Sequence, residues 1–155
     1  MSIRTADCTP ILLYDPVKNV IGNIHSGWRG TYQKIVQKGI EKMVKQCNCS
    51  PENIIACIGP AICKEHFEVD EDVKQIFEET FSYMSDINEF IQKGQNNKYY
   101  IDTNYINKKL LQEMGVKPEN IIESKICTVC NHENIHSYRV DKEKSGRNTA
   151  IIGLI

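Results

Sequence analysis

Residues 9–25 read TPILLYDPVKNVIGNIH, and this stretch decides the fold. Residues 9–14 form a short apolar run that is typical of a buried strand, and residues 20–25 indicate a second strand. The segment between them, Asp15-Pro16-Val17-Lys18-Asn19, is rich in residues that favour turns. Two strands joined by a tight turn predict an antiparallel hairpin.

Further helices and strands are mixed along the rest of the chain. Apolar spacing predicts helices over residues 31–46, 70–81 and 103–114. Thr31 is the expected N-cap of the first helix, and Gly115 is expected to end the last one. Short strands are expected at residues 54–58, 67–69, 99–101, 121–122 and 149–155, and an exposed loop at residues 89–98.

Size and composition restrict the class of protein. The 155 residues suit one compact domain over residues 1–155. A net charge of −1 argues against a nucleic-acid-binding domain. No apolar stretch approaches the ~18 residues of a membrane span, and the N-terminus lacks the apolar core of a signal peptide. We therefore expect a cytoplasmic protein with no membrane partner. Its seven cysteines are then reduced, and metal binding or catalysis is a better use for them than disulfides.

Cys8 precedes the first strand of the hairpin and His25 ends the second, so hairpin geometry can bring them together. The histidine can lower the thiol pKa and create a nucleophile. Alternatively, both side chains can bind zinc or copper. A buried structural cysteine beside an unrelated histidine is the third interpretation.

The next residues, Ser26-Gly27-Trp28-Arg29-Gly30, favour a binding site. Trp28 can form an aromatic wall, and the guanidinium of Arg29 suits an anion such as phosphate. Arg139 and Arg147 lie near a polar turn further along. They are either solvated surface charges or additional anion ligands beside Arg29.

A second cluster, CTVCNHENIH, spans residues 127–136. Cys127 and Cys130 followed by His132 and His136 resemble a compact zinc site, although zinc modules usually place the second ligand pair farther along the chain. Reduced cysteines in a loop are therefore the favoured interpretation. His66 is expected to be a polar surface residue.

A series of motifs occurs in order along the chain: TADC at 5–8, HSGWRGT at 25–31, CIGP at 57–60, FEV at 67–69, CT at 127–128, HSYR at 136–139 and SGR at 145–147. Over essentially its whole length the sequence resembles the laccase-domain family, also called multicopper polyphenol oxidase or purine nucleoside phosphorylase proteins. The resemblance implies an α/β (α+β) fold, a layered sandwich with a mixed β-sheet like that of deamidase toxins that have a Cys–His pair. It also implies purine nucleoside and phosphate as ligands. Family members hold a metal through His, Cys and His, of which Cys8 and His25 match the last two.

One departure concerns the first metal-binding histidine, which in the family lies well upstream of the TADC motif. Only seven residues precede Cys8 here, so the chain is expected to be truncated at its N-terminus relative to the family. His132 or His136 would be the substitutes. Missing strands would leave an exposed sheet edge, which is a route to self-association.

The leading hypothesis is a purine nucleoside phosphorylase with adenosine deaminase activity that depends on zinc, or alternatively copper, and is impaired by the missing ligand. A metal on Cys8 and His25 would activate water or polarise the substrate. Arg29, with Arg139 or Arg147, would hold phosphate, and Asp7 is a candidate general acid. The alternatives are a metal-free Cys–His thiol hydrolase or deamidase, a laccase-like polyphenol oxidase, and a non-catalytic remnant.

Overall fold

The computed structural model describes residues 1–155 and confirms the α/β class with a mixed sheet. The main sheet has the strand order β3-β2-β4-β8. Its members are β2 (Thr9–Asp15), β3 (Val20–Ser26), β4 (Ile55–Ile58) and β8 (Ile121–Glu123). Strands β2 and β3 form the expected hairpin, whereas β4 and β8 are parallel. The parallel pair brings together two segments that are far apart in the sequence.

Two smaller sheets complete the strand set. One pairs β1 (Ser2–Thr5) with β9 (Asn148–Ile151), and the other has the order β5-β7-β6. The second comprises β5 (Glu68–Val69), β6 (Ile91–Lys93) and β7 (Tyr99–Ile101). Asn23 of β3 donates its side-chain amide to the carbonyl of Ala150 at 3.1 Å, which ties the β1–β9 pair to the main sheet.

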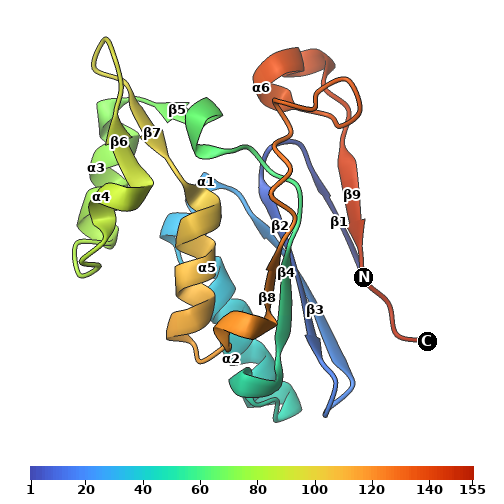
Figure 1. The fold of residues 1–155 in the computed structure, drawn as a ribbon. Coiled ribbons are helices and arrows are strands. Elements are labelled where there is room, and N and C mark those ends of the chain that lie inside the picture. Colours follow the sequence, from blue (N-terminus) through green and yellow to red (C-terminus); the bar gives the residue numbers. More distant parts are fainter.

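Helices α2 and α5 lie on one side of the main sheet, and the β1–β9 pair lies on the other, with α6 above β9 (Figure 1). Helix α2 packs on β3 and on α5. The helices are α1 (Trp28–Tyr32), α2 (Ile35–Cys47), α3 (Glu71–Thr80), α4 (Ile87–Phe90), α5 (Thr103–Glu113) and α6 (Tyr138–Asp141). Single turns of 3₁₀ helix occur at Pro51–Asn53, Lys64–His66, Pro118–Asn120 and Lys142–Lys144. No helix is both long enough and apolar enough to cross a lipid bilayer.

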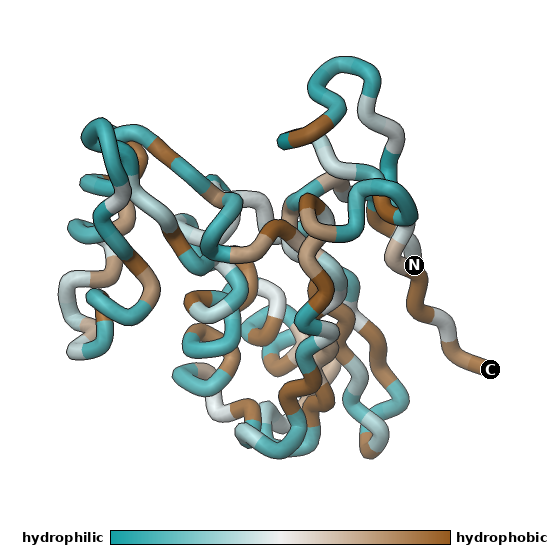
Figure 2. Tube along the Cα trace, turned by 45° about the horizontal axis from the view of Figure 1, so that its top comes forward, coloured by the Kyte–Doolittle hydropathy of each residue, from teal (hydrophilic) through white to brown (hydrophobic).

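The core joins the inner face of the sheet to these helices. Ile11 and Leu13 of β2 are almost completely buried, as is Leu110 of α5. Phe81 packs edge-on against Phe90, with ring centroids 6.1 Å apart. Apolar segments accordingly run along the strands in Figure 2, while the outer loops are mostly hydrophilic.

The helix expected at residues 31–46 is interrupted, and that prediction was wrong in one respect. Lys34 adopts a left-handed conformation with φ of 56°, so α1 ends before it and α2 begins after it. Thr31 is not an N-cap. It lies inside α1, fully buried, and its hydroxyl donates to the carbonyl of Gly27 at 3.1 Å.

Two other local expectations also need correction. Residues 89–98 are only partly a loop, because buried Phe90 ends α4 and β6 pairs with β7 through a turn in which Asn96 and Asn97 have positive φ. The C-terminal strand is shorter than expected, since β9 ends at Ile151. Its partner β1 was not expected at all.

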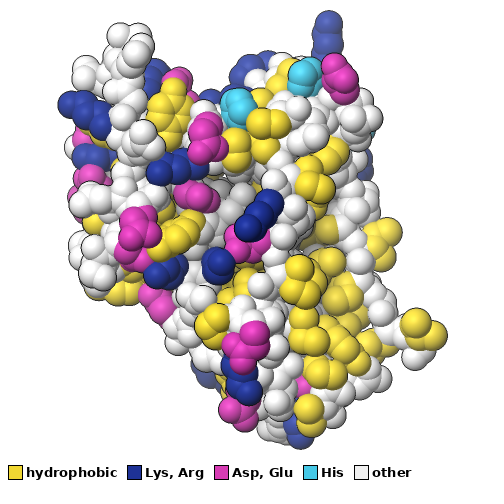
Figure 3. All heavy atoms as spheres, viewed as in Figure 1, with side chains coloured by type: hydrophobic (Ala, Val, Ile, Leu, Met, Phe, Trp, Pro, Cys, Tyr) yellow, Lys and Arg dark blue, Asp and Glu magenta, His cyan; other side chains and the backbone are white.

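The two sides of the molecule differ in character. Hydrophobic side chains gather over the sheet side in Figure 3, and charged ones gather over the helices. Leu12, Cys57 and Ile122 share one cross-strand row on the outer sheet face, and Ile122 is 56% exposed. This row makes the outer face apolar.

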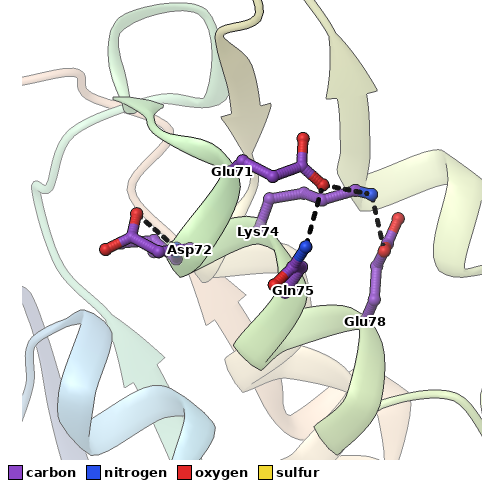
Figure 4. A network of polar contacts seen from close by, with 6 residues as sticks. Glu71, Asp72, Lys74, Gln75 and Glu78 are labelled. Atoms are coloured by element: carbon purple, nitrogen blue, oxygen red, sulfur yellow. Dashed lines mark hydrogen bonds and ion pairs between the residues drawn. The ribbon is translucent and has the colours of Figure 1, made fainter.

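Helix α3 carries a charge network on its polar face (Figure 4). Lys74 lies between Glu71, at 3.2 Å, and Glu78, at 2.7 Å. Pairs at i,i+3 and i,i+4 spacing on an exposed helix surface are screened by solvent and stabilise the helix only weakly. The network therefore supports the helix, and none of its three residues lines the pocket beside Cys8.

Candidate functional site

The register of the β2–β3 hairpin brings Cys8 and His25 together. Thr9 pairs with Ser26 and Pro10 pairs with His25, so Cys8, just before the strand, faces Gly27. A Cβ atom placed on Gly27 would lie 3.0 Å from the Cys8 sulfur and 4.0 Å from His25 Nε2. The absence of a side chain at Gly27 therefore leaves room between the two reactive atoms.

A pocket of about 330 Å³ opens beside Cys8. Its lining includes Trp28, Phe67 and Tyr138, which offer aromatic surface, together with the polar Asp7 and Arg139. His25, Arg29 and Arg147 are not among its lining residues. The pocket thus combines a thiol, an aromatic wall and a guanidinium.

Asp7 links three segments around this pocket. Its carboxylate accepts a hydrogen bond from the Thr128 hydroxyl and another from the Arg139 backbone amide, both at 2.6 Å. Its carbonyl accepts from the amide of Ile62 at 2.9 Å, and its backbone has φ of 83°. Because both carboxylate oxygens are already engaged, Asp7 fits a positioning role better than that of a general acid.

A buried polar group anchors the loop that carries Gly27 and Trp28. The Ser26 hydroxyl lies 3.0 Å from the Thr31 hydroxyl and donates to the Asn107 side-chain oxygen at 2.9 Å. Asn107 belongs to α5 and is fully buried. Buried hydrogen bonds of this kind fix side-chain and loop geometry, so α5 holds the loop in place beneath the pocket.

The three predicted anion-binding arginines have different environments. Arg139 lines the pocket, and its guanidinium donates one hydrogen bond, to the Glu68 carbonyl at 3.1 Å. The Arg29 guanidinium stacks 4.1 Å from the Trp28 ring centroid. Arg147 donates to the carbonyls of Ser145 and Gly146 at 2.8 Å. Only Arg139 therefore faces the cavity.

The surroundings of Cys8 favour the neutral thiol. Burial and the negative charge of Asp7 raise its pKa, and the positive charge of Arg147 only partly offsets them. A raised pKa leaves little thiolate at neutral pH. This disfavours a metal-free enzyme in which Cys8 is the nucleophile.

A separate cluster of metal-binding side chains consists of Cys63, His66, Cys127 and Cys130. Their donor atoms all lie within 4.8 Å of one another, so the four residues could hold a metal ion. The sequence grouped Cys127 and Cys130 with His132 and His136 as the less favoured alternative, whereas the structure groups them with Cys63 and His66. His132 instead directs Nδ1 at the Val129 carbonyl, 3.0 Å away, and the ring of His136 packs against Gly146.

His66 is therefore not simply a surface residue, and Cys63 was not expected in a site. The pattern Cys63-x-x-His66 is the sequence signal that could have found them, since it repeats the spacing of Cys127-x-x-Cys130. Burial opposes ionisation of Cys127, but hydrogen bonds from the amides of Cys130 and Cys63 outweigh it and lower the thiol pKa to about 7.

The Cys8–His25 pair does not make a metal site by itself. Catalytic zinc usually has three protein ligands. Neither Cys8 nor His25 belongs to any group of three His, Cys, Asp or Glu donors in this structure. His132 and His136, the expected substitutes, line no part of the Cys8 pocket.

Two curated proteins are similar in sequence to this chain over most of its length. The chain is 37% identical over 147 residues to a purine nucleoside phosphorylase of Bacteroides thetaiotaomicron, covering 95% of this chain and 54% of the relative. It is 34% identical to adenosine deaminase RL5 of an unknown prokaryotic organism, covering 95% of this chain and 55% of the relative.

Among solved structures, Bacillus licheniformis hypothetical protein YfiH matches with a TM-score of 0.89 and 28% identity, over 96% of this chain and 55% of that one. The chain thus spans about half the length of the curated relatives it matches. The family model described as multi-copper polyphenol oxidoreductase laccase matches residues 1–155, and the chain belongs to this family.

Proposed function

We propose that the Cys8 pocket binds a purine nucleoside and supports its phosphorolysis. The observation that carries the proposal is the meeting of Cys8, an aromatic wall and Arg139 in one cavity at the end of the β2–β3 hairpin. The names of relatives in the same family, purine nucleoside phosphorylases among them, support it.

The aromatic wall and Arg139 each have a task in this reaction. Trp28, Phe67 and Tyr138 offer aromatic faces against which a purine can stack. Arg139 uses one N–H on Glu68, and its remaining donors can bind a phosphate oxygen. A phosphate oxygen attacks the ribose carbon C1′ as the bond to the purine nitrogen breaks. The purine leaves with the bonding electrons and takes the proton that the attacking phosphate hydroxyl gives up, and ribose 1-phosphate is the other product.

Asp7 contributes by position. Its carboxylate accepts a hydrogen bond from the backbone amide of Arg139. This bond fixes the main chain of Arg139, from which the guanidinium extends into the pocket lining. The steps above use side chains of this chain and no metal. A zinc or copper ion at Cys8 and His25 would require a further donor.

The test is release of free base from inosine or adenosine by the purified chain, with and without phosphate. We expect phosphate-dependent formation of base and ribose 1-phosphate, resolved by chromatography. Arg139→Ala should raise the KM for phosphate at least tenfold, since a charge-assisted contact is worth about 1.5–3 kcal/mol. Arg4→Ala, an exposed arginine on β1, is the matched control. Absence of base release by the folded chain would overturn the proposal and favour a non-catalytic role.

A second candidate is hydrolytic deamination of adenosine, which the relative named adenosine deaminase RL5 favours. Its product is inosine with release of ammonia, and it needs no phosphate. An ammonia assay without phosphate therefore separates the two reactions. Oxidation of a phenol by dioxygen, measured in the same samples, tests the activity in the family's description.

A further inference from the structure

The fold brings two short ligand pairs to one place. Cys63 and His66 follow β4, and Cys127 and Cys130 follow β8. These two strands are parallel neighbours, so their carboxyl ends meet at the same edge of the sheet (Figure 1). Beyond that edge a parallel bridge between Ala61 and Cys127 continues the pairing. The cluster therefore results from the topology of the main sheet.

The position of His66 is the decisive observation. Its Nδ1 lies 3.1 Å from the sulfur of Cys63, 3.6 Å from that of Cys127 and 3.7 Å from that of Cys130. A ring nitrogen has one proton or one lone pair, so hydrogen bonding can satisfy only one of three sulfurs. With Zn–S and Zn–N bonds of about 2.3 and 2.0 Å in a tetrahedron, nitrogen and sulfur ligands are about 3.5 Å apart. The observed separations match shared coordination of one ion.

We propose that Cys63, His66, Cys127 and Cys130 bind one zinc ion in a closed tetrahedral site with a structural role. Three thiolates and one imidazole form a ligand set typical of structural zinc. Four protein ligands leave no coordination position for water or substrate, so this ion is not the one that the family resemblance assigns to Cys8 and His25. The amide of Cys63 donates to the Cys127 sulfur at 3.3 Å, and such a hydrogen bond would hold a metal-bound thiolate in place.

The site would brace the walls of the Cys8 pocket. Ile62 precedes Cys63 and Phe67 follows His66, and both line the pocket. Thr128 follows Cys127 and donates to Asp7. Zinc would thus fix the two loops between which the pocket opens, without touching the substrate.

The experiment measures zinc per chain by elemental mass spectrometry, independently of activity. We expect one zinc in the wild type, and zinc retained in Cys8→Ala and Cys47→Ser. Cys47 is a free, exposed cysteine outside the cluster and serves as the matched control. Cys130→Ser, which changes an exposed ligand, and Cys63→Ser should lose zinc or bind it at least tenfold more weakly. His66→Cys, which keeps four ligands, should retain it.

Two further readouts keep the proposal testable if a variant folds poorly. Cobalt substituted into the wild type should give the intense visible and near-ultraviolet bands of a tetrahedral thiolate site, and His66→Cys should shift them. In wild-type protein, bound zinc should protect Cys63, Cys127 and Cys130 from iodoacetamide while Cys47 reacts. Equal zinc content together with equal zinc affinity in wild type and Cys130→Ser, no zinc uptake by the reduced metal-free chain, or bound copper in place of zinc would overturn the proposal.

Discussion

At the scale of single residues, Gly27 controls the space between Cys8 and His25. Its φ of −75° is allowed for any residue, so alanine there changes the available room and not the backbone. The new methyl group would lie 3.0 Å from the Cys8 sulfur, which must shift. We expect Gly27→Ala to reduce nucleoside turnover between about 10- and 100-fold, with less than about 1 kcal/mol lost from the unfolding free energy.

The comparison for Gly27→Ala is Gly153→Ala, because a Cβ at Gly153 meets nothing within 4 Å. Steady-state kinetics and urea unfolding of both variants separate an effect on the site from a general effect on stability. Unchanged turnover in Gly27→Ala would contradict the assignment of Cys8 and His25 to one site.

Asp15 links folding stability to pH. It is fully buried at the end of β2, and its carboxylate accepts hydrogen bonds from the amides of Val17 and Lys18 at 2.9 and 3.0 Å. Burial opposes its ionisation, but these hydrogen bonds outweigh burial and lower the pKa. Ionised Asp15 therefore stabilises the fold above its unfolded pKa of about 4, and this contribution is lost as pH falls through the folded pKa.

We expect Asp15→Ala to cost about 1–3 kcal/mol of unfolding free energy at pH 7, because two turn amides lose their acceptor. Asp15→Asn keeps a neutral acceptor and should cost less. Urea unfolding at pH 7 and at about pH 3 checks the sign, since the difference between wild type and Asp15→Asn should shrink at the lower pH. If the difference in unfolding free energy between wild type and Asp15→Asn grew at the lower pH, folding would raise the pKa of Asp15 instead of lowering it.

At the scale of elements, Asn48 ends helix α2. It has φ of 53° and ψ of 34°, and its amide donates to the Val44 carbonyl at 3.1 Å, which is the hydrogen bond of a left-handed helix C-cap. The side chain of Asn48 is exposed, so its effect on the free energy of unfolding comes from its backbone conformation. We expect Asn48→Ala to cost about 1 kcal/mol, and Asn48→Gly to be neutral or stabilising. Thermal unfolding measures both, with exposed helical Gln46→Ala as the control.

Patterns within one element were predictable from the sequence. The hairpin follows from two apolar runs around a turn-rich segment, and the end of α5 follows from Gly115, whose φ is 91°. The break between α1 and α2 was not predictable, because apolar spacing continues through Lys34 and only the backbone reveals its left-handed conformation. A local pattern cannot report a conformation that tertiary packing imposes.

Contacts between distant elements were harder to predict. Cys8 and His25 belong to one hairpin, so their proximity could be inferred. His66 and Cys127 are 61 residues apart, and they meet only because β4 and β8 pair in parallel. The histidines nearest to Cys127 in sequence were the wrong candidates for the same reason.

At the scale of the whole molecule, Asp7 joins the N-terminal strand region to three later parts of the chain. Its partners are Ile62 beyond β4, Thr128 beyond β8 and Arg139 at the start of α6. Ile62 and Thr128 are the sequence neighbours of Cys63 and Cys127 in the metal-binding cluster, and Arg139 lines the pocket. A single residue thus couples the cluster, the pocket and the N-terminal hairpin.

We expect Asp7→Ala to lower the unfolding free energy by about 2–4 kcal/mol, because Thr128 and Arg139 each lose the acceptor of a short hydrogen bond. Asp7→Asn should cost less, since its amide can still pair with both groups. Hydrogen exchange measured by mass spectrometry should show faster exchange at residues 127–141 in Asp7→Ala than in wild type, while helix α3 stays unchanged. Faster exchange in α3 as well would indicate general destabilisation, and Asp7 would then not be a specific link between the pocket and the C-terminal segment.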